Sequence, residues 1–417
     1  MPLEEAWLRH VQQARWFAGK GLEVRSVAIE PLGFHTPAGA LPAVRSELAR
    51  FSHPDRTDDY HLLVGYLAPG TAGPAGFVGR TTLPGLGPVE VVDATASPLA
   101  RTAFLTAVGW ADGDPVPRLF AGEQSNSTLI AGQTMVKVIR RVEAGRNPDA
   151  EALDALTATG VTPRLRGVLS DSGYDLAIAS ERILDAADGW AFACRACADA
   201  VPIDAELVAL GAALRTVHQR LASAFGLSVR TGDEIRQTML ERLDTARAAV
   251  VELRPYAAGL ADRYAVLAGR ELPVQRVHAD FHLGQALLAP DGWKLIDFEG
   301  EPGRPLAERR LPHPEERDLA GLLRSLDYAR SAHRHPDRQQ ARSWCRRGRE
   351  AFLDGYGKAG VDLDVLRAYE TDRAVYEVTY EVRNRPDWAA IPLAAVQDGI
   401  SRSAVTAAAQ QEESDDV

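Results

Sequence analysis

An acid, an amide and a second acid follow one another between residues 278 and 302. Asp280 lies in the segment HADFHLGQ, Gln285 comes five residues later, and Asp297 lies in the segment LIDFEG. Phosphoryl transfer to an alcohol requires this order, because one carboxylate accepts the proton of the attacking hydroxyl while an amide oxygen and a second carboxylate hold Mg²⁺ against the phosphates. We therefore predict Asp280 as the catalytic base and Gln285, Asp297 and the nearby Glu299 as Mg²⁺ ligands. The alternative is a β-hairpin whose acids face solvent.

A lysine in the middle of an apolar strand is the second chemical feature. Lys137 lies in the segment TMVKVI, and it is one of four lysines among 47 basic residues. Glu151 in the next helix can pair with it, and in such a pair the ammonium grips the phosphates of a nucleotide while the glutamate fixes its direction. The alternative is an ordinary edge-strand lysine. We predict the nucleotide-binding role.

Two further segments are candidates for nucleotide contacts. The polar turn at residues 124–128 precedes the strand of Lys137, where hydroxyls and backbone N–H groups can cover phosphates in place of a glycine-rich loop, although an ordinary turn would look the same. Residues 180–182 stand where the β-rich region passes into the helical one, and by this position alone they resemble a hinge whose backbone hydrogen-bonds adenine. The full predicted nucleotide set is Lys137, Glu151, Ser125, Asn126, Ser127, Ser180, Glu181 and Arg182.

The last predicted helix carries two acids four residues apart, Glu377 and Glu381. Like charges at this spacing repel, and acids near the C-terminus of a helix are disfavoured, so something must compensate them. Either the arginines at 373 and 385 pair with them, or this face binds a polyhydroxylated or cationic sugar. For the second case we predict Glu377, Glu381, Trp388 as a stacking surface, and His282 of the catalytic segment as the substrate contacts.

The first two regions of the chain are predicted to be rich in strands. Residues 1–95 open with a helical stretch at 2–17 and continue as short strands separated by Pro/Gly turns, which predicts a cap subdomain. Residues 96–179 contain a predicted hairpin with strands at 127–130 and 134–140, followed by a helix that Asn147 and Pro148 begin. We predict a nucleotide-binding lobe there.

The third region, residues 180–409, is predicted to be mostly helical and to hold the catalytic and sugar-binding site. One β-like interruption stands inside it at residues 274–298, and the acidic tail at 410–417 is predicted to be disordered. Apolar residues at helical spacing predict helices at 204–225, 233–253, 316–330, 338–356 and 364–383.

Composition narrows the class of protein further. The 417 residues are 46% hydrophobic and 25% charged with a net charge of −10, which is typical of a globular protein and opposes nucleic acid or an anionic membrane as partner. No run of eighteen apolar residues occurs and the N-terminus is acidic, so we expect a cytoplasmic protein. The three cysteines, Cys194, Cys197 and Cys345, are predicted to be buried free thiols rather than a metal or redox site.

Four stretches together resemble the aminoglycoside-phosphotransferase-like superfamily of kinase-like proteins. Within it, the chain is similar to actinobacterial maltokinases and the related glucosamine kinases. The spacing from Asp280 to Gln285 equals that of the kinase catalytic loop, while His278-Ala279-Asp280 departs from the H-G-D usual in the family, and the cap is shorter than that of mycobacterial maltokinases. The stretches are WFAGKG at 16–21, EQSNS at 123–127, residues 278–302, and YEVTYEVRNRPDW at 376–388.

The resemblance implies a bilobal α/β (α+β) fold like that of eukaryotic protein kinases, with an N-terminal cap and a mostly helical C-terminal lobe. It implies phosphorylation of a sugar hydroxyl with ATP as co-substrate and Mg²⁺ as cofactor. The acidic face of the last helix favours glucosamine at its 6-hydroxyl over maltose at its anomeric hydroxyl, and an aminoglycoside kinase is a more distant alternative. A silent binding protein is opposed by the presence of Asp280, Asp297 and Lys137. The expected partners are ATP and a small sugar, with a monomer or a homodimer left open.

Overall fold

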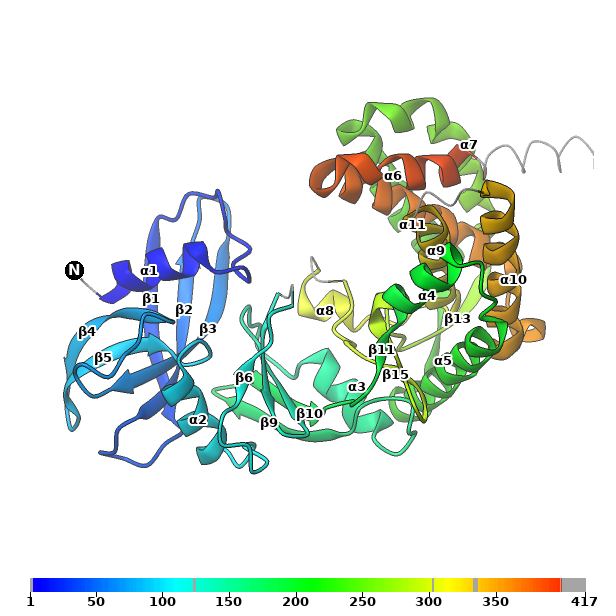
Figure 1. The fold of residues 1–417 in the computed structure, drawn as a ribbon. Coiled ribbons are helices and arrows are strands. Elements are labelled where there is room, and N and C mark those ends of the chain that lie inside the picture. Colours follow the sequence, from blue (N-terminus) through cyan, green and yellow to red (C-terminus); the bar gives the residue numbers. More distant parts are fainter. Residues whose placement is uncertain (1–2, 123–124, 302–303, 333–336, 398, 400–417) are drawn as a thin grey trace, which may run out of the picture. The chain divides into compact units, whose positions relative to one another are not determined.

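The computed structural model describes residues 3–122, 125–301, 304–332, 337–397 and 399 (Figure 1). The chain divides into two compact units. The first comprises Met1–Thr157 with Pro163–Leu184, and the second comprises Ala158–Thr162 with Asp185–Val417. The predicted tail at 410–417 lies outside the described residues. None of the described helices combines the length and the apolar character needed to cross a membrane.

The cap region of the first unit is a five-stranded antiparallel sheet between two helices. Side chains alternate across a strand, so Leu62 and Val64 of β3 join a core with helix α1, whereas Leu63 joins a core with helix α2. The strand order is β1-β2-β3-β5-β4. The elements are α1 (Leu3–Gln13), β1 (Ser26–Phe34), β2 (Ala43–Ser52), β3 (Thr57–Leu67), β4 (Phe77–Leu83), β5 (Gly87–Asp93) and α2 (Pro98–Ala107).

A second antiparallel sheet completes the first unit. The predicted hairpin is confirmed as β7 and β8, which turn at Gly132 with a positive φ of 54°. Phe104 of α2 shares a core with Leu129 and Val136 of this sheet, so the cap region and the second sheet are packed as one body. In the order β6-β7-β8-β10-β9, the strands are β6 (Arg118–Leu119), β7 (Ser127–Ala131), β8 (Thr134–Val138), β10 (Tyr174–Glu181) and β9 (Leu165–Asp171), and helix α3 (Pro148–Leu156) follows β8.

The second unit is mostly helical, as predicted. Helices α5 and α10 have the predicted bounds, whereas α6 ends earlier than predicted and passes into a 3-10 turn (Val251–Tyr256) that contains Pro255, which cannot continue an α-helix. The helices are α4 (Gly189–Ala198), α5 (Asp204–Phe225), α6 (Gly232–Ala249), α7 (Ala257–Tyr264), α8 (Leu306–Arg309), α9 (Glu316–Ala332), α10 (Arg338–Tyr356) and α11 (Leu363–Asn384).

Two small sheets interrupt these helices. The predicted β-like segment contains β14 (Ala286–Ala289) and β15 (Gly292–Leu295), and β14 lies between β15 and β11 (Ala187–Asp188) in a three-stranded sheet. Strand β13 (Glu271–Gln275) pairs instead with β12 (Leu227–Thr231). The candidate catalytic residues therefore lie on the loop between β13 and β14 and just after β15.

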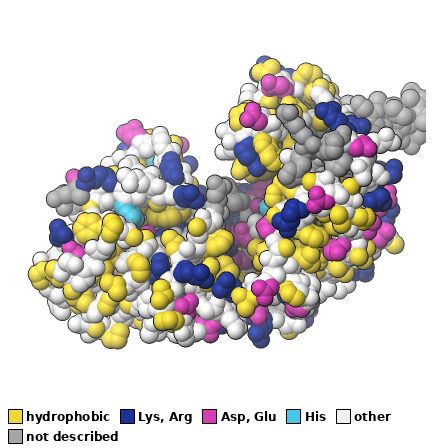
Figure 2. All heavy atoms as spheres, in the orientation of Figure 1, with side chains coloured by type: hydrophobic (Ala, Val, Ile, Leu, Met, Phe, Trp, Pro, Cys, Tyr) yellow, Lys and Arg dark blue, Asp and Glu magenta, His cyan; other side chains and the backbone are white. Residues whose placement is uncertain are grey.

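The cysteines are buried, and the surface carries charges of both signs. All three cysteines are buried and free, as predicted, and burial raises the pKa of the Cys194 thiol to about 11. Figure 2 shows basic and acidic side chains interspersed on the face in view. Arg50 and Asp59 form an ion pair at the surface with atoms 2.9 Å apart, and such pairs contribute little to stability.

Candidate active site

The loop after β13 is anchored by a buried acid of helix α9. The backbone N–H groups of His278 and Ala279 donate to the two carboxylate oxygens of Asp318 at 2.7 and 2.8 Å. His218 of α5 lies 3.0 Å from the same carboxylate. Burial opposes the charge of Asp318, but the hydrogen bond with His218 lowers its pKa. Sequence reasoning missed Asp318, because only the tertiary fold brings it to a loop 40 residues earlier in the chain.

Ala279 stands where the family's H-G-D pattern has glycine, and its backbone conformation is one that glycine favours. Its φ is +69°, in the left-handed region that glycine adopts freely and that costs other residues about 1–2 kcal/mol. The two hydrogen bonds to Asp318 hold the loop in this conformation. Strained backbone of this kind is concentrated at functional sites.

Asp280, the predicted catalytic base, contacts helix α11. Nη2 of Arg373 donates to Oδ1 of Asp280 at 2.9 Å. The same guanidinium lies 3.7 Å from Glu377 and 3.8 Å from Glu301. Burial opposes its charge, but these three acids raise the pKa of Arg373 above its ordinary value. The catalytic segment and the predicted sugar-binding helix are therefore joined through one arginine that sequence reasoning did not identify as functional.

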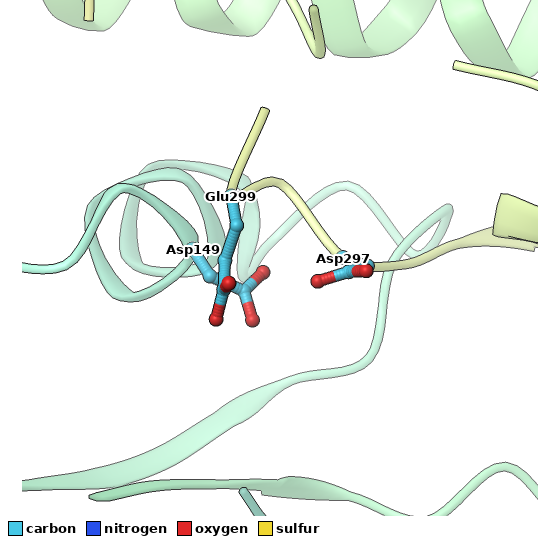
Figure 3. Close-up of side chains that lie close together, drawn as sticks. All are labelled: Asp149, Asp297 and Glu299. Atoms are coloured by element: carbon cyan, nitrogen blue, oxygen red, sulfur yellow. The ribbon is translucent and has the colours of Figure 1, made fainter. Parts of the chain in front are cut away.

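The three predicted Mg²⁺ ligands lie together in the second unit. Nε2 of Gln285 donates to Oδ2 of Asp297 at 3.2 Å. Carboxylate oxygens of Asp297 and Glu299 lie within 4.8 Å of each other just after β15, and Figure 3 shows both side chains. Asp297 has a φ of +66°, a second strained position in this site. Amide and carboxylate oxygens are the donors that Mg²⁺ prefers, so the residues present fit the expected ion.

Lys137 has an acidic partner in helix α3, but it is Asp149. Nζ of Lys137 lies 2.8 Å from Oδ2 of Asp149, whose side chain is 5% exposed on the first turn of the helix (Figure 3). The predicted cap of this helix is confirmed, because Oδ1 of Asn147 accepts from the N–H of Asp149. Glu151 stands two residues further, about 200° around the helix axis, so it faces another direction. Its pairing with Lys137 stays a prediction.

Arg140 forms hydrogen bonds with two residues of the predicted phosphate loop. Oδ1 of Asn126 accepts from the backbone N–H of Arg140 at 3.0 Å, and Oγ of Ser127 accepts from its Nε at 2.8 Å. Ser127 is buried, so its hydroxyl is committed to this arginine, whereas Ser125 is exposed. Glu123 and Gln124 lie outside the described residues.

Two backbone N–H groups of the predicted adenine hinge already donate hydrogen bonds within the protein. Ser180 and Glu181 lie inside strand β10. The N–H of Glu181 donates to the carbonyl of Arg164 at 2.9 Å, and the N–H of Arg182 donates to that of Gln133 at 2.8 Å. These two N–H groups are therefore unavailable to adenine, a restriction that depends on strand pairing and that a local sequence pattern does not reveal.

Arginines compensate both acids of the last helix, which is one of the two alternatives predicted from sequence. Glu377 is buried, and its Oε2 accepts two hydrogen bonds from Arg324 at 2.7 and 3.0 Å. Glu381 is 2% exposed and accepts two hydrogen bonds from Arg385 at 2.7 and 2.9 Å. The alternative of arginine pairing therefore holds, with Arg324 as an additional partner.

The two remaining predicted substrate residues also have structural contacts. Nδ1 of His282 accepts from the N–H of Gly284 at 3.0 Å and caps the 3-10 turn (Leu283–Gln285) that carries Gln285. Burial lowers the pKa of His282. Trp388 stacks on Tyr328 with ring centroids 6.3 Å apart. It also lines a cavity of about 350 Å³ together with Trp190, Ala191, Cys194, Arg195 and Ala332.

Comparison with known proteins finds two glucosamine kinases that are similar in sequence to this chain. No family model matches the chain. A glucosamine kinase from Streptacidiphilus jiangxiensis is 31% identical over 310 residues, which cover 65% of this chain and 70% of that protein. A glucosamine kinase from Mycolicibacterium smegmatis is 28% identical over 314 residues, which cover 66% of this chain and 77% of that protein.

Solved structures of glucosamine kinases share the fold. One, a complex with glucosamine, ADP and inorganic phosphate, has a TM-score of 0.65 at 23% identity and covers 94% of this chain and 98% of its own. Another structure, a glucosamine kinase in crystal form B, has a TM-score of 0.67 and covers 94% of this chain and 99% of its own. The expected kinase-like fold is thereby confirmed. The chain belongs to the glucosamine kinase family.

Proposed function

We propose that this protein transfers the γ-phosphate of ATP to a hydroxyl of glucosamine and so forms glucosamine 6-phosphate. Two relatives are glucosamine kinases by name, and one solved glucosamine kinase is described with glucosamine, ADP and inorganic phosphate. In this chain, the catalytic loop supports the proposal most. It fixes Asp280 through the backbone bonds to Asp318, with Gln285 and Asp297 in contact on the same unit.

Asp280 accepts the proton of the sugar hydroxyl in this reaction. Arg373 holds its Oδ1, and within the described residues no hydrogen bond reaches its Oδ2, which is therefore the proton acceptor. The hydroxyl oxygen forms a bond to the γ-phosphorus while the bond from that phosphorus to the leaving oxygen of ADP breaks. Positioning a base in this way is typically worth 10²–10⁴-fold in rate.

The phosphates have three kinds of protein contact in our proposal. Gln285, Asp297 and Glu299 would hold Mg²⁺, which neutralises charge on the phosphate oxygens. Lys137, directed by Asp149, binds phosphate oxygens in the first unit. The hydroxyl of Ser125 and nearby backbone N–H groups cover the phosphates. The adenine contacts fall to backbone groups other than the N–H groups of Glu181 and Arg182.

Glu377 is the better candidate of the two acids for the sugar ammonium. Both oxygens of Glu381 accept hydrogen bonds from Arg385. In contrast, Arg324 occupies only Oε2 of Glu377, and Oε1 faces Arg373 at the longer distance of 3.7 Å. Because Arg373 also contacts Asp280, an ammonium at Oε1 would place the sugar near the catalytic base. Trp388 and His282 stay predicted contacts.

An ADP-release assay across several acceptors tests the proposed function. We expect glucosamine to be phosphorylated far better than glucose or N-acetylglucosamine, because glucose lacks the charge and acetylation removes it. A charge-assisted contact is worth roughly 1.5–3 kcal/mol, or about one to two powers of ten in kcat/KM. NMR of the product identifies the phosphorylated hydroxyl. If maltose or kanamycin were turned over faster than glucosamine, the proposed substrate would be wrong and the assigned catalytic residues would stand. If no acceptor were turned over, the result would favour a binding protein without catalytic activity. A cytoplasmic location, and a monomer or homodimer, stay predictions.

A further inference from the structure

Arg140, two residues after strand β8, is fully buried inside the first unit. Its Nη2 donates to both carboxylate oxygens of Asp93 at 2.9 and 3.1 Å and also to the hydroxyl of Thr95. Its guanidinium carbon lies 4.6 Å from the ring centre of Trp16. Asp93, Thr95 and Trp16 all belong to the cap, here the five-stranded sheet β1–β5 with helix α1 and the segments adjoining them.

The other edge of the same side chain reaches the predicted phosphate loop. Nε of Arg140 donates to Ser127, and its backbone N–H donates to the side chain of Asn126. Arg140 therefore connects the end of β5 with Asn126 and Ser127 of the predicted loop. The planar fork of arginine makes such a two-sided contact possible, and the point charge of lysine cannot reproduce it.

The backbone beyond β8 is also paired with the cap. Tyr60 of β3 forms an antiparallel bridge with Arg141. The N–H of His61 donates to the carbonyl of Arg140 at 2.7 Å, and the N–H of Val142 donates to that of Asp59 at 2.9 Å. The strand of Lys137 therefore continues directly into a segment that the cap holds.

These contacts indicate a role beyond packing. A buried ion pair contributes little net stability compared with apolar residues of similar volume. Its main effect is therefore to fix the positions of the groups that it joins. Arg140 fixes the cap on one side and the loop on the other, and neither Asp93 nor Thr95 is among the predicted nucleotide contacts.

We propose that the cap, through Arg140, positions the phosphate loop at 125–127 and the strand of Lys137, so that cap residues remote from the nucleotide set its affinity. Arg140 is then a positioning residue, and the cap is part of the nucleotide-binding apparatus. This inference rests on the proposed function in one respect, namely that the loop covers the phosphates of ATP.

The first test compares two charge-conserving variants of the full-length enzyme. Arg140→Lys keeps a charge for Asp93 but loses the bond to Ser127. Arg45→Lys is the matched control, because Arg45 bonds the buried Glu47 in the same sheet and has no contact with the loop among the described residues. We expect Arg140→Lys to raise the KM for ATP about tenfold with the KM for glucosamine unchanged, and Arg45→Lys to change neither. Equal effects of both variants, or an unchanged KM for ATP in Arg140→Lys, would overturn the inference.

A double-mutant cycle decides the matter even if Arg140→Lys fails to fold. Thr95→Val removes an acceptor on the cap side and Ser127→Ala removes one on the loop side, and Arg140 contacts both residues. We expect the increase in the dissociation constant for ADP in the double variant to be smaller than the product of the two single increases. Increases that multiply would show that Arg140 transmits nothing. Because ADP binding needs no sugar, a wild-type enzyme inactive on glucosamine would refute the proposed substrate and leave this test intact.

Discussion

Nη2 of Arg373 lies 2.9 Å from Oδ1 of Asp280, so the predicted catalytic base is held by the helix that was predicted to bind the sugar. In the proposed mechanism, this contact leaves Oδ2 of Asp280 as the proton-accepting atom and restricts rotation of the carboxylate. Glu301 helps to fix the arginine, and although burial opposes its charge, Arg317, Arg242 and Arg304 lower the pKa of Glu301 to about 2.

Arg373→Lys should lower kcat by about 10²-fold, because a small displacement of a catalytic group costs about that much. The KM for ATP should stay within twofold of the wild-type value. Arg349→Lys is the matched control, since Arg349 of α10 bonds Glu370, which lies on α11 as Arg373 does. Steady-state kinetics of the two variants check this, and a wild-type kcat in Arg373→Lys would show that Asp280 needs no such support.

The proposed metal ligands should differ in severity. Asp297→Ala should abolish Mg²⁺-dependent turnover, and Gln285→Ala should raise the Mg²⁺ concentration needed for half-maximal activity, because an amide contributes less than a carboxylate to a hard cation. Activity titrated with Mg²⁺ measures both effects. A greater loss in Gln285→Ala at saturating Mg²⁺ would reverse the assigned ligand roles.

Lys137 and Asp149 should act as one pair. Lys137→Ala should weaken nucleotide binding, Asp149→Ala should do so less, and the double variant should lose less than the sum of the two free-energy changes. Glu151→Ala serves as the comparison, and the observed pairing predicts a smaller effect there than in Asp149→Ala. Titration with ADP measures all four proteins. Strict additivity, or a dominant effect of Glu151→Ala, would restore the pairing predicted from sequence.

His61 should make the stability of the first unit sensitive to acid. Burial, with the charge of Arg140, lowers its pKa from 6.5 to about 3, so the unfolded chain binds a proton between these values and the folded chain does not. The contribution is fully present above pH 6.5 and is lost as the pH falls toward 3. From pH 6.5 to 5 the free energy of unfolding should fall on the order of 2 kcal/mol through this group. Urea denaturation should therefore show a shallower pH dependence in His61→Gln, and parallel curves would contradict the prediction.

Local patterns predicted the elements better than the contacts between them. Helix periodicity gave the bounds of α5 and α10, and the Asn147 cap gave the start of α3. Strand β2 was not singled out, because Arg45 and Glu47 interrupt its apolar pattern, and the structure pairs these two residues with each other and with Tyr66 of the neighbouring strand.

The site shows the same division. Sequence spacing brought Gln285 and Asp297 into one prediction, and the structure places them in contact. Arg373 and Asp318 escaped it, because they meet the catalytic loop across 93 and 39 residues of chain. Asp149 escaped it because the direction of a helical side chain depends on how the helix packs, which composition does not determine.

The kcat of Asp280→Asn at saturating ATP, Mg²⁺ and glucosamine tests the central claim most directly. The substitution keeps the shape of the side chain and removes the proton-accepting charge. We predict a fall of at least about 10²-fold in kcat relative to the wild-type enzyme, with the affinity for ADP unchanged. A kcat equal to that of the wild-type enzyme would contradict the assignment of Asp280 as the base and with it the proposed mechanism.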